Sequence, residues 1–220
     1  MTDLTVLYYT SNREDEKFEK NIRKNILKQK GNLPLISVSQ KPIDFGQNIC
    51  VGEHENCYGN EFRQIQIGLR QVKTKYVISA ESDVLYPPEY FQFQPTDANY
   101  YRYSNVWMHY ARPQTNLDGP LVAFFKLYTD GAQIMKTEFW LNLIDNNIGT
   151  EDTWFTKEYT LNRFTQETIP QNTWTSENPV ITFKTLNNIS RKSCYKKRIE
   201  PLSSLPYWGD INKLKKRICF

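Results

Sequence analysis

The sequence contains three short polar segments whose residue types could do chemistry, and the most suggestive is Glu81-Ser82-Asp83. This segment directly follows the apolar run at residues 75–80, which is typical of a buried strand. Two carboxylates separated by one residue at a strand end can hold a divalent cation, because Mg²⁺ and Mn²⁺ prefer oxygen ligands alongside substrate phosphates. Without that context, the same triplet would far more often be a solvated turn, since such triplets occur by chance in most proteins.

The second polar segment, Thr10-Ser11-Asn12-Arg13, follows another apolar run at residues 4–9. Ligands bind at the carboxyl ends of parallel strands in open α/β sheets, so we expect the two segments to share one edge. The third segment, Gly149-Thr150-Glu151-Asp152, offers two adjacent carboxylates, one of which could take a proton from a hydroxyl group. Acidic residues at the start of a helix are also favourable for electrostatic reasons alone.

The elements that must position these segments begin with a βαβ unit. Residues 4–9 form a short apolar run without alternation, as expected of a strand covered on both faces. Phe18, Ile22 and Ile26 recur at helical spacing, with acids early, lysines late and Gly31 to end the helix. Residues 33–39 predict the next strand, parallel to the first.

The rest of the chain continues the alternation of helices and strands. Residues 46–59 are expected to form a polar surface loop, and helical spacing at residues 62–72 leads into the strand at residues 75–80. Further strands, in an antiparallel or mixed arrangement, are predicted at residues 100–103, 106–110, 121–128 and 180–183. Further helices are predicted at residues 132–143 and 151–164.

This order of elements predicts one α/β domain with a mixed, mostly parallel sheet, over residues 1–190. Residues 191–220 are expected to form a basic C-terminal extension packed on the same domain. The extension carries nine basic and two acidic residues, although the whole chain has a net charge of only +4. It is expected either to meet a polyanion or to be a solvated basic surface.

Composition excludes several classes of protein. With 39% hydrophobic and 14% aromatic residues, the chain has too much core material for wholesale disorder. Four cysteines without paired short spacing favour a reduced, cytoplasmic protein over a zinc site or a disulfide framework. We expect neither a signal peptide nor a membrane span, since no segment approaches ~18 consecutive apolar residues.

The order of the three polar segments resembles that of the GT-A glycosyltransferases, especially the inverting family-2 kind and the related galactosyltransferase-like group. The resemblance runs from Leu4 to about Lys192 and includes Asn60-Glu61-Phe62-Arg63, at the start of the helix before the acid-x-acid triplet. It implies a Rossmann-like domain that moves a sugar from a nucleoside-diphosphate sugar, expected to be a UDP-sugar, to an acceptor hydroxyl with inversion.

Carried over by position, the resemblance implies a role for each candidate residue. Asp83 would ligate Mn²⁺ or Mg²⁺ with help from Glu81, whose longer side chain makes it the less direct ligand. Asp152 would be the catalytic base, and Glu151 would orient an acceptor or sugar hydroxyl. The residues expected near the nucleotide, the diphosphate or the donor sugar are Thr10, Asn12, Arg13, Arg63, Ser82 and Lys184.

The late strand departs from the family pattern. Many relatives add a metal-binding histidine there, shortly before a polar motif that residues 187–191 resemble, but residues 181–185 read Ile-Thr-Phe-Lys-Thr. Three alternatives stay open. Asp83, Glu81, phosphate and water hold the metal, or Lys184 takes over part of the charge neutralisation, or the activity has been lost.

The acceptor side offers weaker signals. His109 shares a strand face with Trp107, which favours a place in the core or in an acceptor cleft over metal ligation, and His54 is expected to be solvated. The candidate acceptor residues are Trp107, His109, Arg191 and Lys192.

These observations predict a metal-dependent, inverting glycosyltransferase with a polyanionic acceptor, such as a hydroxymethylated DNA base. A polysaccharide or protein acceptor is an alternative. The rival from another class is a non-catalytic nucleotide- or glycan-binding module of the same fold. A nucleotidyltransferase is disfavoured because no glycine-rich phosphate loop follows the first strand. The sequence predicts no oligomeric state.

Overall fold

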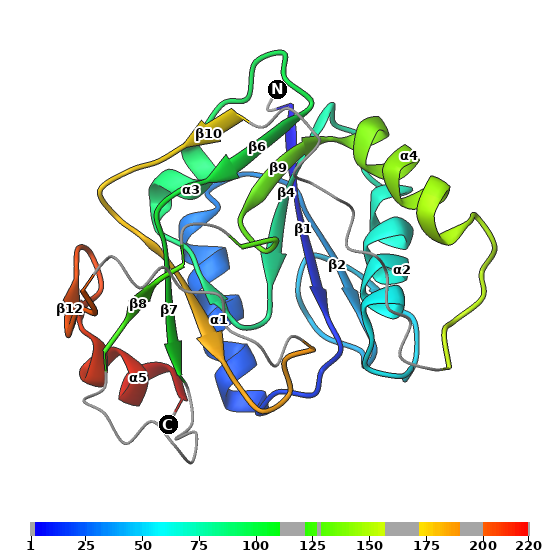
Figure 1. Ribbon diagram of the computed structural model, residues 1–220. Coiled ribbons are helices and arrows are strands. Elements are labelled where there is room, and N and C mark those ends of the chain that lie inside the picture. The colour runs from blue at the N-terminus through cyan, green and yellow to red at the C-terminus, as the bar shows by residue number, and fades with distance from the viewer. Residues whose placement is uncertain (1–2, 111–121, 127–128, 157–171, 190–199, 220) are drawn as a thin grey trace.

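The computed structural model, which describes residues 3–110, 122–126, 129–156, 172–189 and 200–219, is built around a seven-stranded sheet (Figure 1). In spatial order its strands are β10 (Asn172–Trp174), β6 (Tyr100–Tyr103), β9 (Gln133–Lys136), β4 (Tyr76–Glu81), β1 (Leu4–Thr10), β2 (Leu35–Ser39) and β3 (Gln47–Cys50). Strands β4, β1, β2 and β3 run parallel, β9 is antiparallel to both of its neighbours, and β10 is parallel to β6. The sheet is therefore mixed but mostly parallel.

The two faces of this sheet are covered by different helices. Figure 1 shows α1 (Glu16–Gln29) and α5 (Ile211–Cys219) on one side, and α2 (Tyr58–Leu69) and α4 (Thr137–Ile148) on the other. Because side chains alternate along a strand, Val6 and Tyr8 pack toward α1, whereas Leu7 and Tyr9 pack toward α2. Strand β1 is buried on both faces, which explains its unbroken apolar run.

Helix α1 has clear sequence signals at both ends. The Asp15 carboxylate accepts a hydrogen bond of 3.0 Å from the Phe18 N–H, which satisfies one of the free donors of the first turn. Glu16 and Glu19 lie in the first turn and Lys28 in the last, where their charges favour the helix dipole. Gly31 follows with a φ of 57°, a left-handed conformation that suits glycine.

A second, smaller sheet extends the molecule beyond β4. Its order is β5 (Val84–Leu85), β11 (Val180–Lys184), β7 (Val106–Tyr110) and β8 (Phe124–Phe125). Between the sheets the short helix α3 (Pro88–Gln92) buries Tyr90 and Phe91 in the core that also contains the apolar face of α1. A small hairpin of β12 (Ser204–Leu205) and β13 (Gly209–Asp210) leads into α5.

The C-terminal segment is packed against the rest of the chain. Leu214 and Ile218 of α5 belong to the same apolar cluster as Phe18 and Ile22 of α1. The Asn21 side-chain amide donates a hydrogen bond of 3.0 Å to the Ile218 carbonyl. The basic residues of α5 that point to solvent are Lys213, Lys216 and Arg217.

Most predicted elements are present, but three expectations were wrong. Residues 133–136 form β9 rather than the start of a helix, because they fill the gap between β4 and β6. The expected loop at residues 46–59 contains β3 and the first residues of α2. Residues 151–156 are not helical, and the remainder of that predicted helix, residues 157–164, lies outside the described residues. Among the helices that the structure describes, none is both long and apolar enough to cross a membrane.

Candidate functional site

The carboxyl ends of β1 and β4 meet at one edge of the sheet. Tyr9 pairs with Glu81 in the register of the two strands, and its hydroxyl donates a hydrogen bond of 2.9 Å to Oε1 of Glu81. The Thr10–Arg13 loop and the Glu81–Asp83 triplet therefore leave the sheet side by side, as the sequence predicted.

Glu81 is held closely at this edge. Its backbone N–H donates a hydrogen bond to the hydroxyl of Tyr86. Its carboxylate lies so close to Gly131 that a Cβ atom added to this glycine would come within 2.3 Å of Oε2. Burial raises the pKa of Glu81 well above its ordinary value, and the charges of Asp83 and Glu61 raise it further. Glu81 thus lies in a buried environment beside two other carboxylates.

Asp83 lies in the turn between β4 and β5, two residues beyond Glu81, with Ser82 half-buried between them. Its Oδ2 accepts a hydrogen bond of 2.5 Å from the side-chain amide of Asn188, and its carbonyl accepts one of 2.8 Å from the Phe183 N–H. Burial raises the pKa of Asp83, while the Asn188 hydrogen bond and two lysines act in the opposite direction.

Those two lysines, Lys126 and Lys184, come from two strands of the smaller sheet that lie on either side of β7. Lys184 is the last residue of β11, and Lys126 directly follows β8. Both lie close enough to Asp83 to lower its pKa, and the Lys126 ammonium also donates a hydrogen bond of 3.1 Å to the Thr129 hydroxyl. The Asp83 carboxylate is therefore within electrostatic reach of two cations, of which only Lys184 was predicted.

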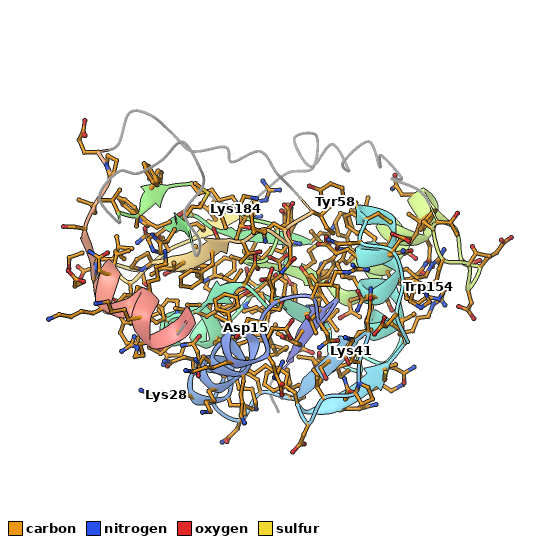
Figure 2. The ribbon with its side chains drawn as sticks, turned by 90° about the horizontal axis from the view of Figure 1, so that it is seen from below. Asp15, Lys28, Lys41, Tyr58, Trp154 and Lys184 are labelled. Atoms are coloured by element: carbon orange, nitrogen blue, oxygen red, sulfur yellow. The ribbon has the colours of Figure 1, made fainter. Side chains whose placement is uncertain are left out.

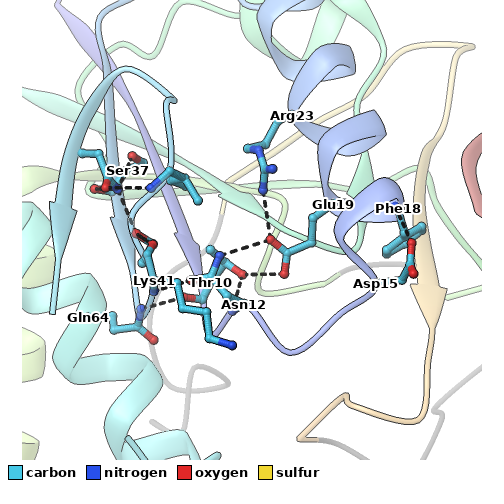
Figure 3. A network of polar contacts seen from close by, with 12 residues as sticks. Thr10, Asn12, Asp15, Phe18, Glu19, Arg23, Ser37, Lys41 and Gln64 are labelled. Atoms are coloured by element: carbon cyan, nitrogen blue, oxygen red, sulfur yellow. Dashed lines mark hydrogen bonds and ion pairs between the residues drawn. The ribbon is translucent and has the colours of Figure 1, made fainter. Parts of the chain in front are cut away.

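The loop after β1 is shaped by a buried carboxylate (Figure 3). The Thr10 hydroxyl donates to Glu19 at 3.0 Å and accepts from the Asn12 N–H at 2.9 Å. Glu19 is also paired with Arg23 at 3.0 Å, and Asn12 has a left-handed φ of 51°. The side chains of Thr10 and Asn12 are thus engaged within the protein, where they hold the loop in place.

Two further contacts fix the position of this loop. The Gln64 amide of α2 donates to the Thr10 carbonyl at 2.9 Å, and the Asn12 side chain accepts from the Lys41 N–H at 2.8 Å. The loop is therefore anchored both to α2 and to the segment after β2.

Arg13 and His54 join the loop after β1 to the segment that precedes α2. The Arg13 guanidinium donates a hydrogen bond of 3.0 Å to the His54 carbonyl. The His54 ring stacks on Trp154, with ring centroids 3.5 Å apart and planes inclined by 8°. His54 is therefore half-buried in a stacked pair, and the expectation that it would be solvated was wrong.

Arg63 faces away from the acidic triplet. Residues two apart on a helix point in directions about 200° apart, and Glu61 acts electrostatically on Glu81. Arg63 instead is fully buried and donates to the carbonyls of Ile148 and Gly149, at 3.1 and 3.2 Å. The structure thus places Arg63 where it supports the end of α4.

Glu151 and Asp152 lie on the same side of α2 as Arg63. Asp152 forms an ion pair with Arg70 at 3.6 Å, and 87% of its side chain is exposed. The segment then runs along α2 to Phe155, which exchanges backbone hydrogen bonds of 2.8 and 3.0 Å with the Asn60 side chain. Seen from below the sheet, Trp154 and Lys184 lie on opposite sides of Tyr58 (Figure 2). The structure does not bring Asp152 and Asp83 together.

The predicted acceptor residues are only partly described. Trp107 is buried, and its indole N–H donates to Asn105 at 3.0 Å. His109 is also buried, its Nδ1 contacts the Val122 carbonyl at 3.1 Å, and burial lowers its pKa. Both residues belong to the core in the described part of the chain, while Arg191 and Lys192 lie outside the described residues.

Two carboxylates at the edge of the sheet could hold a divalent cation together with other ligands. Within the described ranges, no group of three or more acidic, histidine or cysteine side chains could complete a metal site. Two carboxylates, Glu81 and Asp83, are present, and Mg²⁺ is commonly held by one or two carboxylates together with water and substrate phosphates. The donor set therefore suits Mg²⁺ or Mn²⁺ with a phosphate ligand.

Comparison with solved structures identifies the type of fold. TarS 1-349 of S. aureus in complex with UDP-GlcNAc aligns at a TM-score of 0.50 and 15% identity, over 84% of this chain and 59% of that chain. TarS 1-349 alone aligns at 0.50 and 14%, over 83% and 60%. The chain has a GT-A-type fold.

The likeness to these structures concerns the architecture. A third structure, the bifunctional IspDF from Campylobacter jejuni, aligns at a TM-score of 0.43 and 13% identity, over 80% of this chain and 50% of that chain. This chain thus spans half to three fifths of the length of these first matches. No family model matches the sequence, and no curated protein matches it.

Sequence reasoning missed several residues of this GT-A domain that surround the acidic triplet. Tyr9 looked like a core residue of a strand, and Lys126 followed an aromatic run without a motif. Asn188 lay in the polar stretch after the late strand, but nothing in its spacing pointed to Asp83, 105 positions away. Glu14 is partly buried in the same region and accepts a hydrogen bond of 2.5 Å from the Thr185 hydroxyl.

Proposed function

We propose that this chain is a glycosyltransferase that takes a sugar from a UDP-sugar and uses Mg²⁺ or Mn²⁺. The observation that carries the proposal is the pair of carboxylates Glu81 and Asp83 at the carboxyl end of β4, flanked by Lys126 and Lys184. Two acids beside two cations suit a ligand that combines a divalent metal with a diphosphate.

Each charged group has a task in this proposal. Asp83 and Glu81 hold the cation, which when bound supplies Lewis acidity to the departing diphosphate. Lys126 and Lys184 neutralise the phosphate oxygens that lie beyond the metal. The Thr10–Arg13 loop, fixed by Glu19 and Gln64, forms the wall beside the nucleoside.

The choice of nucleoside rests on one relative of the same fold. TarS 1-349 was solved with UDP-GlcNAc, and it aligns over 84% of this chain. We therefore assign a UDP-sugar as the donor to be tested first, with a GDP-sugar as the comparison. The identity of the sugar is an outcome of that test.

The transfer step needs a base on the acceptor side. In an inverting displacement, the acceptor oxygen attacks the anomeric carbon while the bond to the diphosphate oxygen breaks, and the hydroxyl proton passes to a carboxylate. Asp152 is our candidate for this carboxylate, and Glu151 is our candidate for orienting a hydroxyl. In the structure Asp152 is paired with Arg70 on the outer side of α2, so the proposal requires this exposed pair to open and the segment that carries Asp152 to approach the acidic triplet when the substrates bind.

A polyanion is the acceptor class that the charge distribution favours. Lys213, Lys216 and Arg217 are exposed on α5, and residues 191–198 add further basic side chains to the sequence. A hydroxymethylated DNA base would offer both a hydroxyl group and neighbouring phosphates. Polysaccharide and protein acceptors are the alternatives.

The rival function is a nucleotide- or glycan-binding module without catalysis. Titration calorimetry with UDP and GDP, each with and without Mn²⁺, separates the two functions in its first step. Metal-strengthened binding of UDP supports the enzyme, and hydrolysis or transfer from a panel of UDP-sugars then identifies the donor. Nucleotide binding that ignores the metal, with no turnover of any donor, would support the binding module.

A further inference from the structure

The turn after β11 reaches across to the acidic triplet through one side chain. Asn188 donates a hydrogen bond of 2.5 Å from its amide nitrogen to Oδ2 of Asp83. Asp83 lies in the turn between β4 and β5, and Asn188 lies in the turn after β11, which pairs with β5 in the smaller sheet. The contact therefore joins the turn after β11 to a predicted metal-binding carboxylate.

The orientation of the Asn188 amide is fixed by the main chain. The Thr185 N–H donates a hydrogen bond of 2.6 Å to Oδ1 of Asn188. Because a backbone N–H must meet an oxygen, the NH₂ group of Asn188 has to face Asp83. Asn188 consequently acts on Asp83 as a donor and leaves it a carboxylate with a defined orientation.

The same turn holds a second carboxylate, but through other residues. The Thr185 hydroxyl donates to Glu14 at 2.5 Å, and the Asn187 amide donates to Glu14 at 3.3 Å and to the Arg13 carbonyl at 2.8 Å. Asn187 and Asn188 are thus neighbours of the same residue type in the same turn, yet only Asn188 contacts the acidic triplet. The chain itself offers a matched control.

The main chain around Asp83 does not depend on this side chain. The Phe183 N–H donates a hydrogen bond of 2.8 Å to the Asp83 carbonyl and so already ties the turn after β4 to β11. A hydrogen bond from Asn188 to the carboxylate therefore adds orientation to the side chain rather than attachment to the backbone. Groups that orient a metal-binding carboxylate in this way affect metal affinity without touching the metal.

We propose that Asn188 is a positioning residue for the cation site, acting through the Asp83 carboxylate. This inference rests on the proposed function, since it assumes that Asp83 holds Mg²⁺ or Mn²⁺. Asn188 keeps one oxygen of Asp83 engaged and so directs the carboxylate toward the cation and the diphosphate.

The test measures metal binding directly, without any turnover. Mn²⁺ is titrated into the full chain in the presence of UDP, and free Mn²⁺ is followed by electron paramagnetic resonance. Removing a group that orients a metal ligand typically weakens affinity by about 10–100-fold, and we expect a loss in this range for Asn188→Ala. Asn187→Ala, which disturbs the same turn but not the contact to Asp83, should change the affinity less than about threefold by the same reasoning.

The outcomes separate this inference from the proposed function. A wild-type chain that binds no Mn²⁺ with UDP would remove the metal site and this inference together. A wild-type chain that binds Mn²⁺, with unchanged affinity in Asn188→Ala, would overturn the inference alone. Equal losses in both variants would also overturn it, because the effect would then belong to the turn as a whole.

A second measurement covers the case in which Asn188→Ala does not fold. The side-chain amide protons of Asn188 can be followed by NMR in the wild-type chain while Mg²⁺ is added with UDP. We expect these resonances to shift at the same metal concentration as those of the Asp83 backbone. Asn188 side-chain resonances that stay constant while the site fills would contradict the proposed contact.

Discussion

The Tyr9 hydroxyl donates a hydrogen bond of 2.9 Å to Oε1 of Glu81, and so joins the last residues of the central strand β1 to the end of β4. A tyrosine that appears in the sequence as one more core residue thus sets the direction of a predicted metal-binding carboxylate. Tyr9→Phe keeps the packing of the ring and removes only this donor.

We expect Tyr9→Phe to weaken Mn²⁺ binding about tenfold in the presence of UDP, because the orientation of Glu81 is lost while its charge is kept. Manganese titration with UDP checks this effect. Tyr103→Phe is the matched control, since the Tyr103 hydroxyl contacts Ser176 instead. Equal binding by Tyr9→Phe and the wild type would show that the contact with Glu81 is only part of the packing.

Asp83→Ala should abolish the effect of metal on nucleotide binding, because the cation bridges this carboxylate and the diphosphate. Glu81→Gln should retain part of that effect. Calorimetry measures the UDP affinity of both variants, once with Mn²⁺ and once with a chelator. If UDP binds Asp83→Ala as it binds the wild type, and still responds to Mn²⁺, the metal site must lie elsewhere.

Lys126→Gln and Lys184→Gln should each lower the affinity for UDP by about 10–100-fold, since a hydrogen bond to a charged group contributes about 1.5–3 kcal/mol. Uridine, which lacks phosphates, should bind the wild type and both variants equally. This comparison separates loss of phosphate contacts from general damage to the fold. A parallel loss of uridine binding would argue against the assigned role.

Asp152→Asn should lower kcat by about 10²–10⁴ while donor binding is retained, as expected when a general base loses its basicity. Arg70→Ala removes the partner of Asp152 and should leave kcat within a few-fold, because an exposed ion pair stabilises by only about 0–1 kcal/mol. Near-normal turnover by Asp152→Asn would mean that Asp152 serves only as the partner of Arg70 on the outer side of α2.

His109 should make the protein less stable in acid. Burial lowers the pKa of this imidazole in the folded state, so the unfolded chain binds the proton more readily. The free energy of unfolding should therefore fall as the pH drops below the ordinary value of about 6.5. Urea unfolding at several pH values should show a weaker acid dependence in His109→Gln, and an unchanged dependence would assign the effect to other groups.

The central part of the fold could be predicted from the sequence because its signals are local. The apolar runs that became β1 and β4, and the caps of α1, follow directly from residue types and spacing. Strand β9 could not be predicted in this way, since Gln133–Lys136 is a strand only because β4 and β6 lie on either side. Its structure depends on partners far away in the chain.

The same distinction applies to the candidate site. The position of Glu81 and Asp83 at a strand end follows from the apolar run before them. The two faces of α2 decide which other residues join them. Glu61, which acts on Glu81, and Arg63, which contacts the end of α4, are only two residues apart but point to opposite sides of this helix. Contacts such as that of Asn188 with Asp83 depend on the pairing of β5 with β11, two strands far apart in the chain, which no local pattern records.

The packing of α5 on α1 also bears on how the protein is made. Leu214 and Ile218 complete the apolar cluster that Phe18 and Ile22 begin, so this core joins segments that are translated at very different times. Residues up to Ile218 must leave the ribosome before the cluster can close, and until then the apolar face of α1 is incompletely covered. Contacts over such long sequence separations slow folding and prolong the exposure of apolar surface. The apolar face of α1 is therefore made early and completed late.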